Sequence, residues 1–320
     1  MYNKKNNFRL KIYWYLLALT TLIFFSFNGV WWRFLTNEEW LDITFVVFLR
    51  FLWWFSFLLF FILFFTKKED IKKVKESNIL KDKLFWTASI SMFFTILFFV
   101  WWVKFTSATN VSLIQSLAPI LVALLTLYYY PKNNKNINYR KIFFVLIIAS
   151  IGSSLLLSDK SLLSLTTWWD KYFWDFYAFC SMVSFSVFLF FNVELRKKYK
   201  KYNWLIINTL SLLVWLILSS PSIIFYYENV LLMSNTATIY LIITSFGATW
   251  IAYLTWFLAW RYLSAIVLAV LFNIVWIFTI IIESYLYSDY NNPISYKLYL
   301  WMAVIISSVI YINYLSNSKK

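Results

Sequence analysis

The sequence predicts an all-α polytopic membrane protein whose ten transmembrane helices form two inverted five-helix repeats. Three observations lead to this fold class: an unusually apolar composition, apolar segments of membrane-spanning length, and an internal sequence match. The 320 residues are 62% hydrophobic and 13% charged, whereas globular domains are about half apolar and about a quarter charged. The net charge of +15 lies in short clusters between apolar segments, which favours orientation in a membrane over binding to nucleic acid.

Ten apolar segments are long enough to cross a bilayer, which takes about 20 residues of helix. In lipid, a lone segment of this length satisfies its backbone only as a helix. The first segment continues without a small-residue cleavage site, so it is predicted to be a retained span and not a signal peptide. The predicted spans lie near residues 11–32, 43–65, 84–103, 107–130, 141–158, 173–192, 204–225, 237–259, 263–286 and 297–315.

The loops alternate in their content of Lys and Arg. With the N-terminus in the cytoplasm, 23 of the 29 basic residues lie in inner segments and five lie in outer ones. The lysine-rich loop 67–83 contributes most to this excess; it is expected to be a solvated, orienting loop, with a lipid-headgroup or partner site as the alternative. The positive-inside rule therefore predicts a plasma-membrane protein with both termini in the cytoplasm.

Two segments match when the sequence is shifted by 157 residues: SATNVSLIQSLAP from Ser107 and SAIVLAVLFNIVW from Ser264. Each carries small or polar residues at a spacing of four, which places them on one helix face where another helix can approach closely. Five predicted spans separate the copies, so the two must run in opposite directions. The sequence thus predicts two inverted repeats, residues 1–160 and 161–320, an arrangement typical of secondary transporters.

These segments resemble the EamA-type, ten-helix branch of the drug/metabolite transporter superfamily. The resemblance covers nearly the whole chain, although Trp276 stands where the family's second half has a proline. It implies a secondary transporter that moves a small polar metabolite, an amino acid or a related compound, by alternating access at a site between the halves. The motifs that carry the resemblance are FSFNGVWWRF at 25–34, Arg50, TSATNVSLIQSLAPILVALLTLYYY at 106–130, WDFYAFCSMVSFSVF at 174–188 and ATWIAYLTWFLAWRYLSAIVLAVLFNIVW at 248–276.

Polar and aromatic residues at membrane depth are the candidates for a substrate pathway, because burying polar groups in lipid is costly unless they have a partner or a cavity. The candidates are Asn28, Arg50, Ser112, Gln115, Ser116, Pro119, Tyr253, Trp256, Asn273 and Trp276. Pro119 is expected to bend its helix by removing a backbone hydrogen bond.

Each of these candidates also has a structural interpretation. Arg50 either faces a cavity or snorkels and pairs with Asp42 near the outer surface. Gln115 and Asn273 either contact substrate or bond neighbouring helices. Asn28 is equally compatible with an interfacial cap. The tryptophans and tyrosines either line the pathway or belong to lipid-facing and interfacial belts.

Asp175 and Glu283 are the carboxylates placed to act as proton carriers, if either is desolvated in one state and exposed in the other. The chain has no histidine and one cysteine, so no cofactor, no metal and no enzymatic activity are expected. The expected partners are a small-molecule substrate and membrane lipids, with the chain a monomer or homodimer. Two alternatives are a non-transporting membrane sensor or scaffold and a membrane enzyme that modifies lipid head groups.

Overall fold

The computed structural model describes residues 15–27, 41–105, 117–130, 168–226, 233–259 and 265–286, together with isolated positions such as Gln115. Side chains are described for most of these residues, but not for 102–105, 168–175, 248–250, 257–259 or several positions of 273–286. Every described element is a helix. The predicted spans at 141–158 and 297–315 lie almost entirely outside the described residues.

Four predicted spans correspond to long continuous helices: α2 (Ile43–Phe65), α4 (Lys83–Phe105), α8 (Trp168–Lys198) and α14 (Ala265–Leu286). Helix α2 begins where predicted because Asp42 is its N-cap. The Asp42 carboxylate accepts hydrogen bonds from the backbone N–H groups of Thr44, at 2.8 Å, and Phe45, at 3.1 Å, which otherwise have no partner within the helix. The first predicted span is represented by the N-terminal helix Tyr15–Phe27.

Two other predicted spans are interrupted, and a third is described only in part. The span at 204–225 forms α9 (Trp204–Ser219) and α10 (Pro221–Tyr226), because Pro221 has no N–H to continue the first helix. The span at 237–259 forms α12 (Asn235–Ile243), the π-helix η4 (Thr244–Ile251) and α13 (Ala252–Ala259). In the span at 107–130, α6 (Ala118–Tyr129) begins with Pro119 in its first turn, where a missing N–H costs no intrahelical bond.

The lysine-rich loop 67–83 contains more structure than expected. It forms α3 (Lys68–Glu76) and the short 3-10 helix η2 (Ile79–Lys81). Acidic Glu69 and Asp70 lie in the first turn of α3, and Lys73 and Lys75 in the last, the charge order that complements a helix dipole. Val74 and Ile79 are buried at 3% and 2% exposure, so the segment packs onto the bundle.

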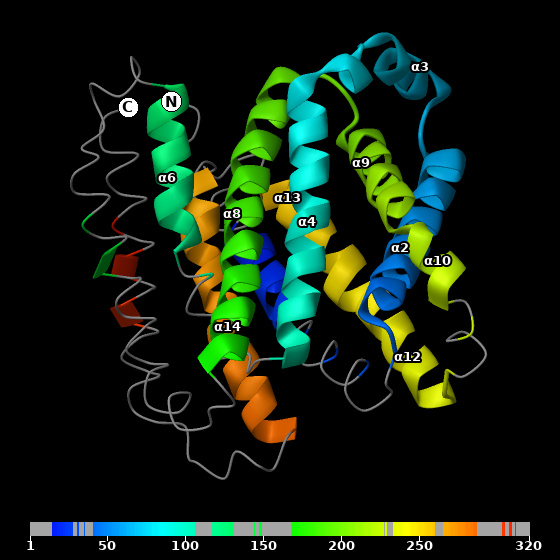
Figure 1. Cartoon of the computed structure of the whole chain (residues 1–320). Helices are drawn as coiled ribbons and strands as arrows, with labels where there is room; N and C mark the ends of the chain where they lie inside the picture. Colours follow the sequence, from blue (N-terminus) through cyan, green and yellow to red (C-terminus); the bar gives the residue numbers. More distant parts are fainter. Residues whose placement is uncertain are drawn as a thin grey trace.

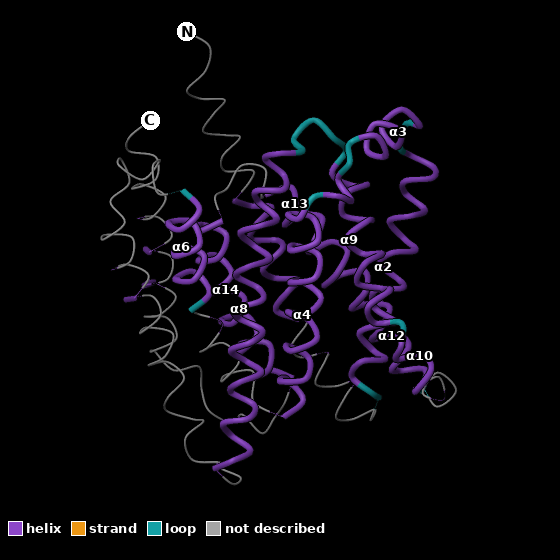
Figure 2. The backbone as a smooth tube through the Cα atoms, turned by 45° about the horizontal axis from the view of Figure 1, so that its top comes forward, coloured by secondary structure: helices purple, strands orange, loops and turns teal. Residues whose placement is uncertain are grey.

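The helices form one bundle, shown in Figure 1, in which α8 packs against both α4 and α6 and α2 packs against α9 and η4. Helix α3 lies at one end of the bundle, beside α9 and near the start of α4 (Figure 2). We refer to this end as the α3 end. The last turn of α8 and the last residue of α6 reach the same end in Figure 1.

Within the described part of the chain, four helical segments are long and apolar enough to cross a membrane: Ile43–Phe65, Lys83–Trp101, Phe176–Lys198 and Asn235–Trp256. Their outward faces carry exposed apolar side chains, such as Leu63 at 67% and Phe64 at 68%, as expected for contact with lipid. The described residues therefore form helices throughout, and these apolar helices indicate a membrane protein. The total of ten spans and the inverted repeat stay a prediction.

Candidate functional site

A cavity of about 70 Å³ lies inside the bundle. The described residues that line it come from the N-terminal helix, α2, α4, α8, α13 and α14, together with Gln115. Both sequence halves, 1–160 and 161–320, therefore contribute to its wall. Four of the predicted pathway residues meet there: Arg50, Gln115, Tyr253 and Trp256.

Arg50 places a positive charge in the cavity wall. Its position, seven residues after the first residue of α2, puts it about 10 Å along the helix axis at 1.5 Å per residue. The residue is 3% exposed. Asp42, the predicted pairing partner, instead caps the start of α2. Burial at mid-helix favours the cavity-facing interpretation of Arg50 over the snorkelling one.

Gln115 lines the cavity and also holds two helices together. Its Nε2 donates a hydrogen bond to Ser181 Oγ of α8 at 3.0 Å, and Ser181 Oγ in turn donates to the Thr95 carbonyl of α4 at 3.1 Å. Gln115 and Ser181 are 3% and 0% exposed. The structure therefore supports both interpretations of Gln115, a polar group in the cavity and a bond between helices.

Aromatic rings make up most of the remaining wall. The Phe25 ring meets Tyr253 edge-on, with centroids 4.8 Å apart, and Trp256 lies 5.9 Å from Phe272. Phe185 completes the group at 4.4 Å from Phe272. The sequence singled out the tyrosine and the tryptophan but not the phenylalanines, because 34 phenylalanines give no signal by which to choose among them.

Small hydroxyl residues join the N-terminal helix to the last helices beside the cavity. Thr21 and Thr255 hydroxyls are hydrogen-bonded at 2.6 Å. Ser26 donates to the Val275 carbonyl at 3.0 Å, and Thr279 donates to the Ser26 carbonyl at 3.1 Å. All are buried, so these bonds form a polar seam between segments about 250 residues apart in the chain.

The other predicted residues do not add to the described cavity. Pro119 is buried in the first turn of α6 but is not among the lining residues. Asp175 belongs to α8, and Asn273, Trp276 and Glu283 belong to α14, with side chains outside the described set. Three further predicted residues, Asn28, Ser112 and Ser116, lie outside the described residues altogether.

At the α3 end, a polar cluster ties the end of α8 to the start of α4. Lys198 forms an ion pair with Asp82 at 2.6 Å, and the Tyr199 hydroxyl donates to Asp82 at 2.9 Å. Burial alone would raise the pKa of Asp82, but hydrogen bonds from Lys198, the Leu84 N–H and Tyr199 lower it below its usual value. Burial and the bond to Asp82 raise the pKa of Tyr199 to about 12.

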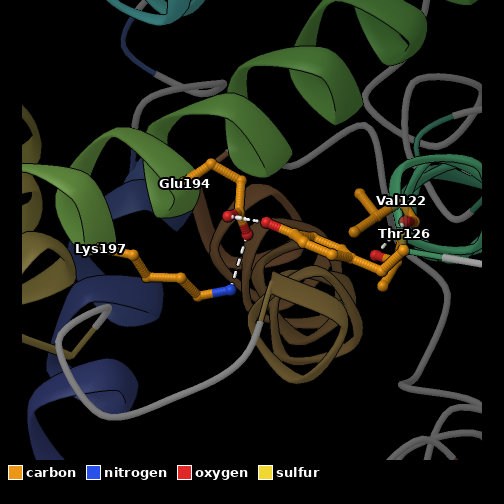
Figure 3. Close-up of polar contacts among 5 residues, drawn as sticks. Val122, Thr126, Glu194 and Lys197 are labelled. Carbon is orange, nitrogen blue, oxygen red and sulfur yellow. Dashed lines mark hydrogen bonds and ion pairs between the residues drawn. The ribbon is translucent and has the colours of Figure 1, made fainter. Parts of the chain in front are cut away.

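A second cluster ties α8 to the end of α6. The Tyr130 hydroxyl donates to the Glu194 carboxylate, which also forms an ion pair with Lys197 at 2.6 Å. Figure 3 shows Glu194 and Lys197 facing each other beside α6. Among the described residues, no group of three or more Cys, Asp or Glu is arranged to hold a metal ion.

The helices are apolar and long enough to cross a bilayer. They surround a buried cavity whose wall is mostly aromatic and includes an arginine. These features define a polytopic helical membrane protein. Residues 12–158 match the model of the EamA-like transporter family, which belongs to the drug/metabolite transporter superfamily. The predicted resemblance is confirmed over that segment. The family indicates a membrane transporter of this superfamily's type and points away from an enzyme.

Solved structures share the fold. One crystal structure, 14% identical in sequence, superposes with a TM-score of 0.65 over 94% of this chain and 95% of its own length. At this identity the likeness concerns the fold alone. No curated protein sequence gives a significant match.

Proposed function

We propose that the protein is a secondary transporter that moves a small polar metabolite, an amino acid or a related compound, across the plasma membrane by alternating access. In this proposal ten helices form two inverted repeats, residues 1–160 and 161–320, which rock about the central cavity. Both termini lie in the cytoplasm, as the positive-inside rule predicts.

The observation that carries the proposal is the composition of the cavity wall. Residues predicted from the sequence as pathway residues, Arg50, Gln115, Tyr253 and Trp256, line one buried cavity to which both halves of the chain contribute. A scaffold would need the packing faces but no polar groups in an internal cavity. The EamA-like match over residues 12–158 supports the same function.

The size of the cavity supports a conformational cycle. Ligand sites for small molecules usually measure about 300–1,000 Å³, whereas this cavity measures about 70 Å³. A metabolite therefore fits only after the surrounding helices move apart. The polar clusters at the α3 end, centred on Asp82 and Glu194, would keep the cavity closed from that side.

The test is solute counterflow in proteoliposomes that contain the purified protein, run against a panel of metabolites with and without a pH gradient. A carrier exchanges labelled external solute for unlabelled internal solute, so a transient overshoot supports alternating access. Asp175→Asn and Glu283→Gln test proton coupling in the same assay. A flat signal for every compound would favour the non-transporting scaffold.

Two tryptophans provide a matched pair of variants for this assay. Trp256 lines the cavity and Trp215 does not, yet each is 1% exposed. We expect Trp256→Phe to lower counterflow at least several-fold and Trp215→Phe to leave it close to wild type once protein amounts are equalised. Equal losses in the two variants would indicate a general packing effect and would count against the cavity as the pathway.

A further inference from the structure

We propose that the segment 67–83, which forms α3 and η2 at the α3 end of the bundle, binds the head groups of anionic phospholipids. The inference goes beyond the transport function and holds whether or not the protein carries a solute. It follows from the level of the segment relative to the bilayer, from the arrangement of its lysines and from the pairing of the acidic side chains around them.

The segment lies at the level of the lipid head groups. Phe64 and Phe65, at the end of α2, are 68% and 70% exposed, and Leu80 in η2 and Trp86 in α4 are 52% and 43% exposed. Exposed apolar side chains of this kind mark contact with a membrane. Trp86 Nε1 also donates to the Leu80 carbonyl at 2.7 Å, and tryptophan is typical of the membrane–water interface. Because the head-group layer adds only about 5–8 Å to each side of the hydrocarbon, the residues between Phe65 and Trp86 lie within it.

Helix α3 carries its lysines in an ordered pattern. The helix packs beside α9 through buried Val74, which is 3% exposed, and it lies at the edge of the bundle (Figure 1). Four exposed residues share one helix face, at the spacing i, i+3, i+4 and i+7: Lys68, Ile71, Lys72 and Lys75. We call them the basic face. Lysines around an exposed isoleucine suit the interface, because the apolar group reaches the lipid tails while the ammonium groups stay among the head groups.

The ion pairs of the segment leave an excess of positive charge. The segment contains seven lysines and four acidic residues, so three lysines would stay unpaired even if every acidic residue formed a pair. Two ion pairs lie within α3, each at 3.9 Å: Lys72–Glu76 and Lys73–Asp70. Exposed pairs of this kind contribute little. Lys68 and Lys75 form no ion pair with another described residue.

Other acidic side chains at the α3 end are already paired. Asp82 forms its ion pair with Lys198, and Glu194 forms one with Lys197, at 2.6 Å each. The other segments predicted on this side of the membrane contain basic residues and no acidic one: 1–10, 131–140, 260–262 and 316–320. These segments therefore cannot neutralise the basic face, and its charge is available to an anion.

A phospholipid head group fits this surface better than a soluble anion does. Lysine binds phosphate as a point charge, and a basic segment directly beside a membrane span attracts anionic lipids. An acidic segment of another protein is the rival occupant, since it offers the same charge. The position of α3 between lipid-exposed Phe65 and Leu80 favours the lipid, because phosphate groups of the bilayer already lie at that depth.

The test compares two lipids that share their acyl chains and differ in charge: anionic dioleoylphosphatidylglycerol and zwitterionic dioleoylphosphatidylcholine. Each is titrated into the purified full-length protein in detergent at low salt, with inorganic phosphate as a third ligand. Binding is measured by thermal stabilisation, since a ligand that binds the folded state raises the melting temperature. Each lysine near an anionic surface strengthens binding roughly fivefold. We therefore expect phosphatidylglycerol to bind at least roughly 30-fold more tightly than phosphatidylcholine, with a smaller ratio at high salt, and inorganic phosphate not to stabilise the protein.

Double variants locate the preference on α3. Lys68→Gln/Lys75→Gln removes two lysines of the basic face and should lower the ratio between the two lipids at least about tenfold, whereas Lys68→Arg/Lys75→Arg keeps the charge and should keep the ratio. Lys200→Gln/Lys201→Gln is the matched control. It removes the same charge from two exposed lysines that follow α8 and should leave the ratio close to wild type. A ratio between lipids is not altered by a general loss of folded protein.

Three results would overturn the proposal. Equal binding of the two lipids to the wild type would leave the basic face to solvent or to an acidic protein segment. Equal loss of the preference in Lys68→Gln/Lys75→Gln and in Lys200→Gln/Lys201→Gln would assign it to the overall charge and not to α3. Stabilisation by inorganic phosphate as large as that by phosphatidylglycerol would show that the surface binds phosphate without a lipid.

Discussion

Gln115 has two roles that a pair of substitutions can separate, since Ser181 accepts its hydrogen bond without lining the cavity. Gln115→Leu removes the bond to Ser181 and the polar group in the cavity, whereas Ser181→Ala keeps the polar group but removes two bonds, the one from Gln115 and the one to the Thr95 carbonyl. At about 0.6 kcal/mol for each interhelical hydrogen bond in a membrane, Ser181→Ala should lower stability at least as much as Gln115→Leu. We expect counterflow to fall at least about tenfold, or ~1.4 kcal/mol, in Gln115→Leu alone. Melting temperatures and counterflow rates measure the two effects. Equal transport losses would leave Gln115 only its packing role.

At the scale of single residues, the sequence predicted the polar part of the site better than its apolar part. Arg50 and Gln115 could be identified because a charge or an amide in an apolar segment is rare and costly. Phe25, Phe185 and Phe272 could not, since phenylalanines occur throughout the spans and their positions relative to a cavity depend on how helices rotate and pack. Ser181 gave no signal either, because a serine in a transmembrane helix is common and often bonds its own backbone.

At the scale of helices, Asp82 joins the start of α4 to the end of α8 and should make the stability of this junction pH-dependent. Its folded pKa is lowered, so the contribution to stability is present above the ordinary carboxylate pKa of about 3.9 and is lost as pH falls through the folded value. Between pH 6 and pH 3, the melting temperature of the wild-type protein should therefore fall further than that of Asp82→Asn.

The same junction gives an alkaline expectation of opposite sign. The pKa of Tyr199 is raised to about 12, so its stabilising hydrogen bond to Asp82 is fully present below the ordinary value of about 10 and is lost as pH rises toward the folded pKa. Tyr199→Phe should remove this dependence. The acid prediction has its own contrary outcome. If the melting temperatures of Asp82→Asn and wild type fell equally between pH 6 and pH 3, the ion pair and hydrogen bonds at this junction would contribute nothing to folding stability.

The sequence predicts which segments form helices better than it predicts where those helices are interrupted. The bounds of α2 agree with the predicted span 43–65, because its apolar run begins directly after an N-cap aspartate. Helix α3 has acidic residues first and basic residues last, an order that favours a helix. The high charge of the segment instead led to the prediction of a solvated loop. The π-helix η4 has no comparable sequence signature, since a wider helical turn arises from tertiary packing, here beside the N-terminal helix at Phe24 and Gly247.

At the scale of the whole molecule, segments far apart in the chain meet in the polar seam of Thr21, Ser26, Thr255 and Thr279. A single sequence cannot specify which residues pair across it. The 157-residue shift relates segments by likeness, while contact depends on the crossing angles and rotations of the packed helices.

The orientation of the molecule gives the last prediction. Lys72 lies in α3 and Lys200 follows α8 by two residues, and α3 and the end of α8 lie at the same end of the bundle (Figure 1). Glu228 follows the predicted span at 204–225, so it is expected on the opposite side of the membrane. All three residues are exposed. Single-cysteine variants at these positions, in a Cys180→Ala background, can be labelled with a membrane-impermeant maleimide. Since inner loops hold the excess of Lys and Arg, we expect Lys72→Cys and Lys200→Cys to react only after the cells are permeabilised and Glu228→Cys to react in intact cells. Labelling of Lys72→Cys in intact cells would invert the molecule, and labelling of Lys72→Cys and Lys200→Cys from different sides would contradict the bundle itself.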